Sequence, residues 1–302
     1  MDSHHSPASV SEKANPLWAA HYADRAGATV AAILENEKIA RDTYRLRLKC
    51  PSIARQMLPG QFVMLRLPES DDPLLGRPLA LYDVVVDASG ESMGLDIVYL
   101  VVGAMTGRLA ECQPGGQLEA WGPLGNGFSP RACGHLVMVA GGIGQTPFLA
   151  LAKERLGKQR FGDPPRAAST VARTTLCYGA RSAEYLAGVD DFAAVGVDVL
   201  TSTDDGSAGH HGLVTALLET VFGESSDDCR VVCCGPEPMM EATARIAAAR
   251  DVPCEVSLET PMACGIGICF SCVAKVLGPD GAWDYKRTCV DGPVFDANRI
   301  VW

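Results

Sequence analysis

Short strand-like runs of residues dominate the chain from Gly27 to Phe128. The clearest runs span 44–48, 61–67 and 95–100, and segments containing Pro and Gly separate them. Runs of this length indicate β-strands, and a close succession of strands divided by turn residues is typical of an antiparallel barrel. This part of the sequence therefore predicts an antiparallel Greek-key β-barrel.

After Pro130 the pattern changes to strand, glycine-rich turn and helix. An apolar run at 136–140 precedes the turn 141–144, and an apolar-periodic segment follows at 147–156. Further strands are predicted at 174–178, 197–200 and 230–233, with helices at 212–222 and 238–249. Because strands that alternate with helices form parallel sheets, we expect a Rossmann-like α/β domain here.

The remaining segments differ from these domains in composition. Residues 1–22 mix Ser, His, Ala and Pro without a sustained period, which predicts a flexible N-terminal arm. The segment 161–171, rich in Pro and Ala, indicates a connecting loop, and from Val252 onward Cys and Gly are concentrated. We therefore divide the chain into an arm at 1–22, a β-barrel at 23–129, an α/β domain at 130–251 and a small C-terminal domain at 252–302.

Composition and charge restrict the classes of function. The 302 residues allow two or three domains, and 47% hydrophobic and 21% charged residues are ordinary for a folded protein. The net charge of -10 argues against a nucleic-acid binder, which needs clustered Lys and Arg. We find no secretory leader, and the apolar runs are shorter than the roughly 20 residues of a membrane span. A cytoplasmic protein without a membrane span is expected.

The spacing of four cysteines is the strongest chemical signal in the chain. Cys264, Cys269 and Cys272 form the pattern C-x4-C-x2-C, and Cys289 follows at a distance. This is the spacing of plant-type [2Fe-2S] ligation. Glycines inside the loop let the chain curl around the metal and leave N–H groups free to bond the cluster.

Two alternatives compete with a cluster at these cysteines. A structural zinc site also takes four cysteines, usually in paired short-spaced knuckles, and buried thiols can be unrelated to one another. In a reducing compartment, short fixed spacings indicate metal or catalysis before disulfides. The other eight cysteines are scattered and are expected to be mostly small core residues: Cys50, Cys112, Cys133, Cys177, Cys229, Cys233, Cys234 and Cys254.

Two turns of the predicted α/β domain suit a nucleotide. One comprises Gly141, Gly142, Ile143 and Gly144, and it lies between a strand and a helix. The other comprises Cys234, Gly235 and Pro236, at the end of the strand 230–233. Open α/β sheets bind ligands at the carboxyl ends of their strands, where pyrophosphate meets free N–H groups at a helix start. Both turns are thus expected to flank one cleft, although a glycine turn alone can serve packing.

Together with Arg77-Pro78-Leu79-Ala80 and the segment Gly122–Phe128, these turns resemble the ferredoxin-NADP reductase superfamily. In that superfamily a flavin-binding barrel precedes a nicotinamide-binding domain. With the cysteine loop and the neighbouring segments Val256–Glu259 and Asp291–Phe295 added, the chain resembles the electron-transfer subunits of NAD-dependent dihydroorotate dehydrogenases. The resemblance implies three cofactors, namely FAD, a [2Fe-2S] cluster and NAD(H).

The resemblance also implies which residues hold FAD. Arg77 would pair with the pyrophosphate, and the strand around Pro78 would run beside the flavin ring, where Ala80 replaces a serine of the relatives. Tyr99 lies in the strand that flanks the ribityl and adenine portions, and Thr106 in a phosphate-holding turn. From the residues alone, Arg77 could be a surface arginine, Tyr99 a core aromatic and Thr106 a helix cap. The expected FAD-binding residues are Arg77, Pro78, Leu79, Ala80, Val98, Tyr99, Leu100, Met105 and Thr106.

The implied function is electron transfer. Hydride transfer between nicotinamide and flavin, and single-electron steps through the cluster, require no catalytic side chain, and we assign none. The chain has no second catalytic domain to oxidise a substrate, so a partner is expected. By resemblance it is an FMN-containing dihydroorotate dehydrogenase catalytic subunit of pyrimidine biosynthesis, in a heterotetramer of two of each chain, with NAD+ as final acceptor.

Alternatives to this assignment remain in the sequence. The same reductase module suits a ferredoxin-NADP transhydrogenase, a sulfide dehydrogenase or a sulfite reductase, and a non-enzymatic redox sensor is a further alternative. NADH and NADPH are not distinguished, because Arg181 either lies near a 2'-phosphate or is a surface residue.

Overall fold

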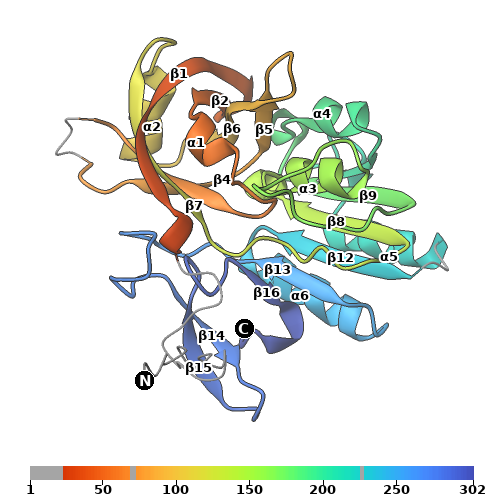
Figure 1. Cartoon of the computed structure of the whole chain (residues 1–302). Coiled ribbons are helices and arrows are strands. Elements are labelled where there is room, and N and C mark those ends of the chain that lie inside the picture. Colours follow the sequence, from red (N-terminus) through yellow and green to blue (C-terminus); the bar gives the residue numbers. More distant parts are fainter. Residues whose placement is uncertain (1–22, 69–72, 225–227) are drawn as a thin grey trace, which may run out of the picture.

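The structure is a computed structural model that describes residues 23–68, 73–224 and 228–302 (Figure 1). The arm predicted for residues 1–22 lies outside the described residues. No helix in these three ranges is long and apolar enough to cross a membrane.

The first domain is a curled antiparallel sheet of seven strands, in the order β4-β3-β7-β1-β2-β6-β5. Its elements are η1 (Ala23–Arg25), β1 (Gly27–Ala40), β2 (Thr43–Lys49), α1 (Pro51–Ala54), β3 (Phe62–Arg66), β4 (Arg77–Ala80), β5 (Asp83–Val86), β6 (Ser92–Leu100), α2 (Ala104–Glu111) and β7 (Gln117–Leu124). The antiparallel barrel predicted from the sequence is confirmed.

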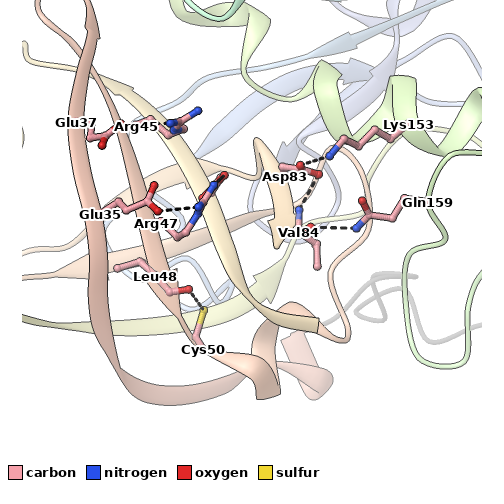
Figure 2. Close-up of polar contacts among 11 residues, drawn as sticks. Glu35, Glu37, Arg45, Arg47, Leu48, Cys50, Asp83, Val84, Lys153 and Gln159 are labelled. Carbon is pink, nitrogen blue, oxygen red and sulfur yellow. Dashed lines mark hydrogen bonds and ion pairs between the residues drawn. The ribbon is translucent and has the colours of Figure 1, made fainter. Parts of the chain in front are cut away.

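Alternation along β2 explains how this sheet closes around a core. Leu46 and Leu48 are fully buried inside the barrel, while Arg47 between them points outward. Burial of each leucine contributes about 1.5–3 kcal/mol. Outside, the Arg47 guanidinium donates to both carboxylate oxygens of Asp96 on β6 at 2.8 Å and to Glu35 on β1 at 2.8 Å (Figure 2). The strands β1, β2 and β6, which are neighbours in the sheet, are thereby linked by ion pairs on the outer face, while the leucines of β2 pack on the inner face.

The second domain is a parallel sheet in the order β11-β10-β9-β8-β12-β13, with β16 added antiparallel at one edge. Its elements are β8 (His135–Gly141), η2 (Gly142–Gln145), α3 (Phe148–Arg155), β9 (Arg173–Ala180), η3 (Ala183–Tyr185), α4 (Val189–Ala194), β10 (Asp198–Thr203), β11 (His210–His211), α5 (Val214–Glu224), β12 (Cys229–Cys234), α6 (Glu237–Ala248), β13 (Cys254–Ser257), β16 (Val294–Asp296) and η4 (Ala297–Arg299). The Rossmann-like α/β prediction is confirmed.

Strand β8 is apolar throughout because both of its faces are covered. Leu136 and Met138 pack with α3 and α4, whereas Val137 and Val139 pack with α5 and α6. A parallel strand between two helix layers therefore appears in the sequence as a continuous apolar run.

The C-terminal region does not begin at the edge of the sheet. The composition changes at residue 252, yet β13 continues the parallel sheet and the chain returns to pair with it as β16. Between these two strands lie the cysteine loop and a two-stranded hairpin, β14 (Val273–Leu277) and β15 (Trp283–Arg287). The cysteine region is thus an excursion from the α/β sheet (Figure 1).

Contacts from β5 and the residues before it fix the barrel to the α/β domain. Lys153 of α3 forms an ion pair with Asp83, and Gln159 donates to the Val84 carbonyl at 3.0 Å (Figure 2). The Tyr82 hydroxyl donates to Asp191 of α4 at 2.7 Å. These bonds set the relative position of the two domains, and hence the shape of the clefts between them.

Candidate redox site

A cleft of about 950 Å³ separates the barrel from the rest of the molecule. The barrel contributes β4, the end of β6 and the start of α2 to its wall. The opposite wall consists of Ile143, Thr146 and Pro147 from the α/β domain and of the segment 257–263. Strand ends and loops that are far apart in sequence thus enclose a space of cofactor size.

All four residues of β4 line this cleft. Arg77 is exposed, and its Nη1 donates to the carbonyls of Leu75 and Gly76 at 3.1 Å. A guanidinium carries five N–H donors, so further donors remain for a phosphate. Pro78, Leu79 and Ala80 are half-buried beside it, and the methyl group of Ala80 offers no hydroxyl to the cleft.

The start of α2 forms the phosphate-sized end of this wall, where 103–106 line the cleft. The Thr106 hydroxyl accepts from the N–H groups of Val102 at 3.0 Å and Gly103 at 3.2 Å, so its side chain serves as a helix cap. The Met105 side chain is buried in the barrel core, and the backbone there does not have positive φ. The first N–H groups of a helix have no partner within the helix, which makes this end attractive to an anion.

Tyr99 serves the barrel core more than the cleft. Its ring is buried and stacks on Tyr44 with 5.7 Å between ring centroids, and its hydroxyl donates to Asn36 at 3.1 Å. Val98 and Leu100 on either side also line the cleft. The core alternative for the Tyr99 side chain therefore describes its contacts best.

A second cleft of about 720 Å³ lies at the carboxyl ends of the parallel strands. Gly141, Gly142 and Ile143 form one side, and Gly235 and Pro236 face them. The two turns follow β8 and β12, which are neighbours in the sheet although the chain has run through β9 and β10 between them. This is the topological switch point at which open α/β sheets bind ligands.

Two of the predicted turn residues, Gly144 and Cys234, do not line the second cleft. A Cβ on Gly144 would lie 2.2 Å from the Cys234 carbonyl oxygen, so this glycine allows the turns to pack together and does not line the second cleft. Cys234 lines the first cleft, and its burial raises the pKa of its thiol. The sequence therefore predicted the paired turns, but not which cleft each residue faces.

Ser202 and Asp204, at the end of β10, are cleft residues that the sequence analysis missed. The Ser202 hydroxyl is buried and has no hydrogen-bond partner among the described residues, and it lines the second cleft. Asp204 lines the same cleft near Arg181, whose carbonyl accepts a bond from the next residue, Asp205, at 3.3 Å. The Gly- and Asp-rich stretch after the predicted strand was the available signal.

The two clefts meet at Glu259. Leu100, Val102, Ile143 and Glu259 line both of them. The Glu259 side chain is exposed to the open clefts, and the protein atoms around it partly desolvate its carboxyl, which raises its pKa above the ordinary value. A carboxyl at this junction faces both clefts.

The four cysteines of the C-terminal loop lie together as two interacting pairs. The Ser271 hydroxyl, the Ser271 N–H and the neighbouring Cys264 lower the pKa of Cys269 to about 6. A hydrogen bond from Cys289 lowers the pKa of Cys272 to about 6, and the same contact raises that of Cys289. In the described ranges no three metal-ligand side chains surround a single ion. Four thiols gathered as two pairs, with the pKa of one thiol in each pair lowered, suit a two-iron cluster, because each iron takes two thiolates.

Backbone N–H groups surround these sulfurs. The N–H of Ile266 points to Cys264 Sγ at 3.4 Å, and that of Gly267 bonds the Cys289 thiol. Gly265 and Gly267 have φ of +73° and +82°, values that a side chain would strain. The loop therefore provides the curled backbone and the N–H donors that a cluster requires.

The barrel anchors this loop. Trp121 Nε1 of β7 donates to the Cys264 carbonyl at 3.0 Å, and Phe62, Met64 and Leu124 pack with the buried Cys272 and Cys289. A bond between the Thr260 and Thr288 hydroxyls joins the wall of the first cleft to the loop, and Thr288 donates to the Cys272 carbonyl at 3.1 Å. The cysteine loop is thus one wall of the larger cleft.

Comparison with known families assigns each of these three regions. Residues 30–128 match the oxidoreductase FAD-binding domain, 138–245 the oxidoreductase NAD-binding domain, and 259–301 the iron-sulfur cluster binding domain of dihydroorotate dehydrogenase B. The chain is 35% identical to the dihydroorotate dehydrogenase B (NAD(+)) electron transfer subunit of Desulforamulus reducens, over 90% of this chain and 97% of that protein. It belongs to this family of electron-transfer subunits.

Other members of the family and related folds agree with this assignment. The electron transfer subunit of Geobacillus thermodenitrificans is 37% identical over 89% of this chain and 96% of that protein. The structure of the NADH-dependent reduced ferredoxin-NADP oxidoreductase matches with a TM-score of 0.76 and 30% identity, covering 91% of each chain. A ferredoxin NADP+ reductase from Neisseria gonorrhoeae shares the fold alone, with a TM-score of 0.58 and 19% identity over 74% of this chain and 91% of that chain.

Membership of the electron-transfer subunit family settles the class of cofactors. The chain is an oxidoreductase with domains for FAD, NAD and an iron-sulfur cluster. The family match decides against the zinc alternative, and the paired thiols and their N–H donors fit the cluster.

Proposed function

We propose that this chain is the electron-transfer subunit of an NAD+-dependent dihydroorotate dehydrogenase, working in the cytoplasm in pyrimidine biosynthesis. It would take electrons from an FMN-containing catalytic subunit through the cluster and FAD to NAD+. The observation that carries the proposal is the continuity of the three sites: the cysteine loop walls the larger cleft, and the larger cleft meets the smaller one at Glu259. FAD, when bound, exchanges paired electrons with the nicotinamide and single electrons with the cluster.

The side chains of the barrel would bind and orient the flavin. Arg77 and the start of α2 would hold its phosphates, while Pro78, Leu79 and Ala80 would present backbone to the ring. Cys264, Cys269, Cys272 and Cys289 would hold the [2Fe-2S] cluster. Because the loop carrying these cysteines is packed on Trp121 and Met64, the fold fixes the cysteines relative to the barrel that would hold the flavin.

The second cleft would hold the nicotinamide nucleotide, with the turns 141–144 and 234–236 around its pyrophosphate. Asp204 and the Ser202 hydroxyl, which has no hydrogen-bond partner in the described part of the chain, suit the two hydroxyls of an adenosine ribose, as an acidic residue does in NAD sites. A 2'-phosphate at this place would meet the Asp204 carboxylate. This charge supports NAD over NADP, although Arg181 is nearby.

The catalytic subunit would dock at the exposed side of the cysteine loop, in a heterotetramer of two copies of each chain. Cys269 is the exposed ligand, and Ile268 and Phe270 beside it are 69% and 62% exposed. Apolar residues at this exposure are common at protein interfaces. An electron acceptor or donor has its shortest approach to the sulfurs on this side.

The proposal is tested by co-expressing the chain with a dihydroorotate dehydrogenase catalytic subunit from the same source. We expect a stable complex that reduces NAD+ when dihydroorotate is added, with iron, acid-labile sulfide, FAD and FMN in fixed ratio. A chain that carries its cofactors but neither binds that subunit nor supports the reaction contradicts the proposal.

One other function has a specific observation in its favour. The likeness to the NADH-dependent reduced ferredoxin-NADP oxidoreductase covers 91% of both chains, so a subunit of such a complex has the same architecture. Reduction of ferredoxin without any response to dihydroorotate would favour this second function. The identity of the co-purified partner separates the two.

A further inference from the structure

Arg287, the last residue of β15, reaches across to the cysteine loop. Its Nη1 donates to the Gly267 carbonyl at 2.9 Å, and its guanidinium carbon lies 5.1 Å from the centroid of the Phe270 ring. Both contacts fall between Cys264 and Cys272. One side chain therefore spans the stretch of loop that carries three of the four cysteines.

Asp291 holds this arginine in place. Its Oδ2 accepts from the Arg287 backbone N–H at 2.8 Å and from Nε at 3.4 Å. The turn between the two residues is closed by the Asp291 N–H, which donates to the Arg287 carbonyl at 2.8 Å, and it carries Cys289. Arg287 thus connects the turn of the fourth cysteine with the loop of the first three.

The backbone of Phe270 shows why the loop needs such a contact. Phe270 has φ of +57°, in the left-handed region that a side chain other than that of glycine rarely adopts, and its ring is largely exposed. A strained conformation persists only where the surroundings hold it, and here the guanidinium over the ring supplies an attraction. Cys269 lies directly before this residue, so the contact bears on the geometry of an exposed ligand.

The charge of Arg287 bears on the cluster itself. Four thiolates around two irons give an anionic group, and each added electron makes it more negative. A fixed cation nearby favours the reduced form, and the attraction is little screened because the Arg287 side chain is only 16% exposed. Asp291 offsets part of this charge, but the Gly267 carbonyl is contacted by Arg287 Nη1, while the Asp291 carboxylate bonds the backbone N–H and Nε of Arg287.

We propose that Arg287 is a positioning residue of the cysteine loop that also raises the reduction potential of the cluster. The proposal rests on the four-cysteine cluster of the proposed function and concerns neither the partner nor the nucleotide. Arg287→Gln removes both the charge and the planar set of guanidinium N–H donors. Arg287→Lys keeps the charge but loses the planar donors. Arg299→Gln is the matched control, because Arg299 donates to the Leu277 carbonyl at 2.8 Å at the far end of the same hairpin.

The test is an anaerobic redox titration of the full-length chain followed by EPR, with iron and sulfide measured on the same samples. At the potential where the wild-type cluster is half reduced, we expect the ratio of reduced to oxidised cluster in Arg287→Gln to fall about tenfold, which corresponds to a midpoint about 59 mV lower for a one-electron couple. Arg287→Lys is expected to have a midpoint potential close to that of the wild type but a broader EPR signal. Arg299→Gln is expected to match the wild type in both.

A cluster-containing Arg287→Gln variant with the midpoint and line shape of Arg299→Gln overturns the proposal. If Arg287→Gln loses its iron while Arg299→Gln keeps it, the positioning role is supported. A wild-type EPR line shape in Arg287→Lys would overturn that role. Absence of iron and sulfide from the wild-type chain would instead refute the cluster, and with it the proposed function.

Discussion

The cysteine loop and the nucleotide cleft bind their ligands by contrasting means. Four sulfurs within one short stretch and one nearby turn form the first site, and the cysteines themselves are its signature. The second site is assembled from the ends of β8, β9, β10 and β12, and glycines are among the residues that line it. A covalently bound cluster needs a few residues at fixed spacing, whereas a dissociable dinucleotide needs a shape that only the folded sheet provides.

Replacing one cluster-binding cysteine should therefore abolish the cluster and leave the nucleotide cleft intact. In Cys269→Ser we expect iron, acid-labile sulfide and the EPR signal to be lost, while NADH still reduces the flavin, because the clefts keep their walls. Cys112→Ser, in the barrel, serves as the control and should retain the cluster. Visible spectra and iron analysis measure the outcome, and a variant that keeps a normal cluster would exclude Cys269 as a ligand.

The nucleotide cleft should be disrupted by a substitution that forces its two glycine turns apart. A Cβ in Gly144→Ala would lie 2.2 Å from the Cys234 carbonyl oxygen, so the paired turns must separate. We expect a loss of about 1–3 kcal/mol in the free energy of unfolding and at least about tenfold weaker NADH binding. Urea denaturation and NADH titration measure both.

Gly223→Ala is the control for that substitution. Nothing lies within 4 Å of a Cβ at this position in α5, and alanine in a helix is favoured by about 0.5–1 kcal/mol over glycine. Equal stability of Gly144→Ala and Gly223→Ala would show that the two turns do not need their close contact.

The ribose end of the cleft offers a finer test. In Asp204→Ser the carboxylate that would repel a 2'-phosphate is removed, and we expect the preference for NADH over NADPH to fall about tenfold, a change of about 1.4 kcal/mol. Asp205→Ser is matched to it, because the Asp205 carboxylate bonds Ser207 within its own turn at 2.6 Å and does not line the cleft. Steady-state rates with NADH and with NADPH measure this preference. An unchanged ratio of the two rates in Asp204→Ser contradicts the assignment of Asp204 to the ribose end of the cleft.

The smallest effect is expected at Glu259, where the two clefts meet. Partial desolvation by the cleft walls raises the pKa of its carboxyl, so the folded chain holds this proton to a higher pH than the unfolded chain does. The stability that it contributes is present below the unfolded value and is lost as pH rises through the raised pKa. Urea midpoints measured between about pH 4 and pH 7 should decline less in Glu259→Gln than in the wild type or in Glu219→Gln, and parallel declines would contradict the raised pKa of this carboxyl.

The sequence predicted elements whose pattern follows from one local cause. Strand β2 was recognised because Leu46 and Leu48 alternate with charged residues that are less buried, and β8 because both of its faces are covered. Strand β1 was missed because its 14 residues combine buried, half-buried and exposed positions without a period. β13 and β16 were missed because their cover comes from distant segments.

The same distinction holds for the site. The cysteine spacing and the two glycine turns were predicted, since each is a local pattern. Ser202 and Asp204 were not, because their role depends on the folding of β10 opposite the turn 141–144. The resemblance places Thr106 in a phosphate-holding turn, and in the structure its hydroxyl caps α2 while the residue also lines the cleft, so the phosphate contact stays a prediction.

The central claim is that one chain connects a pyridine nucleotide to an iron-sulfur cluster through a flavin. Anaerobic titration of the purified chain with NADH, followed by visible and EPR spectra, tests it most directly. The account predicts bleaching of the flavin and the appearance of a reduced-cluster signal that the wild type shows and Cys269→Ser lacks. Protein whose four cysteines hold zinc, or which contains no acid-labile sulfide, would contradict it.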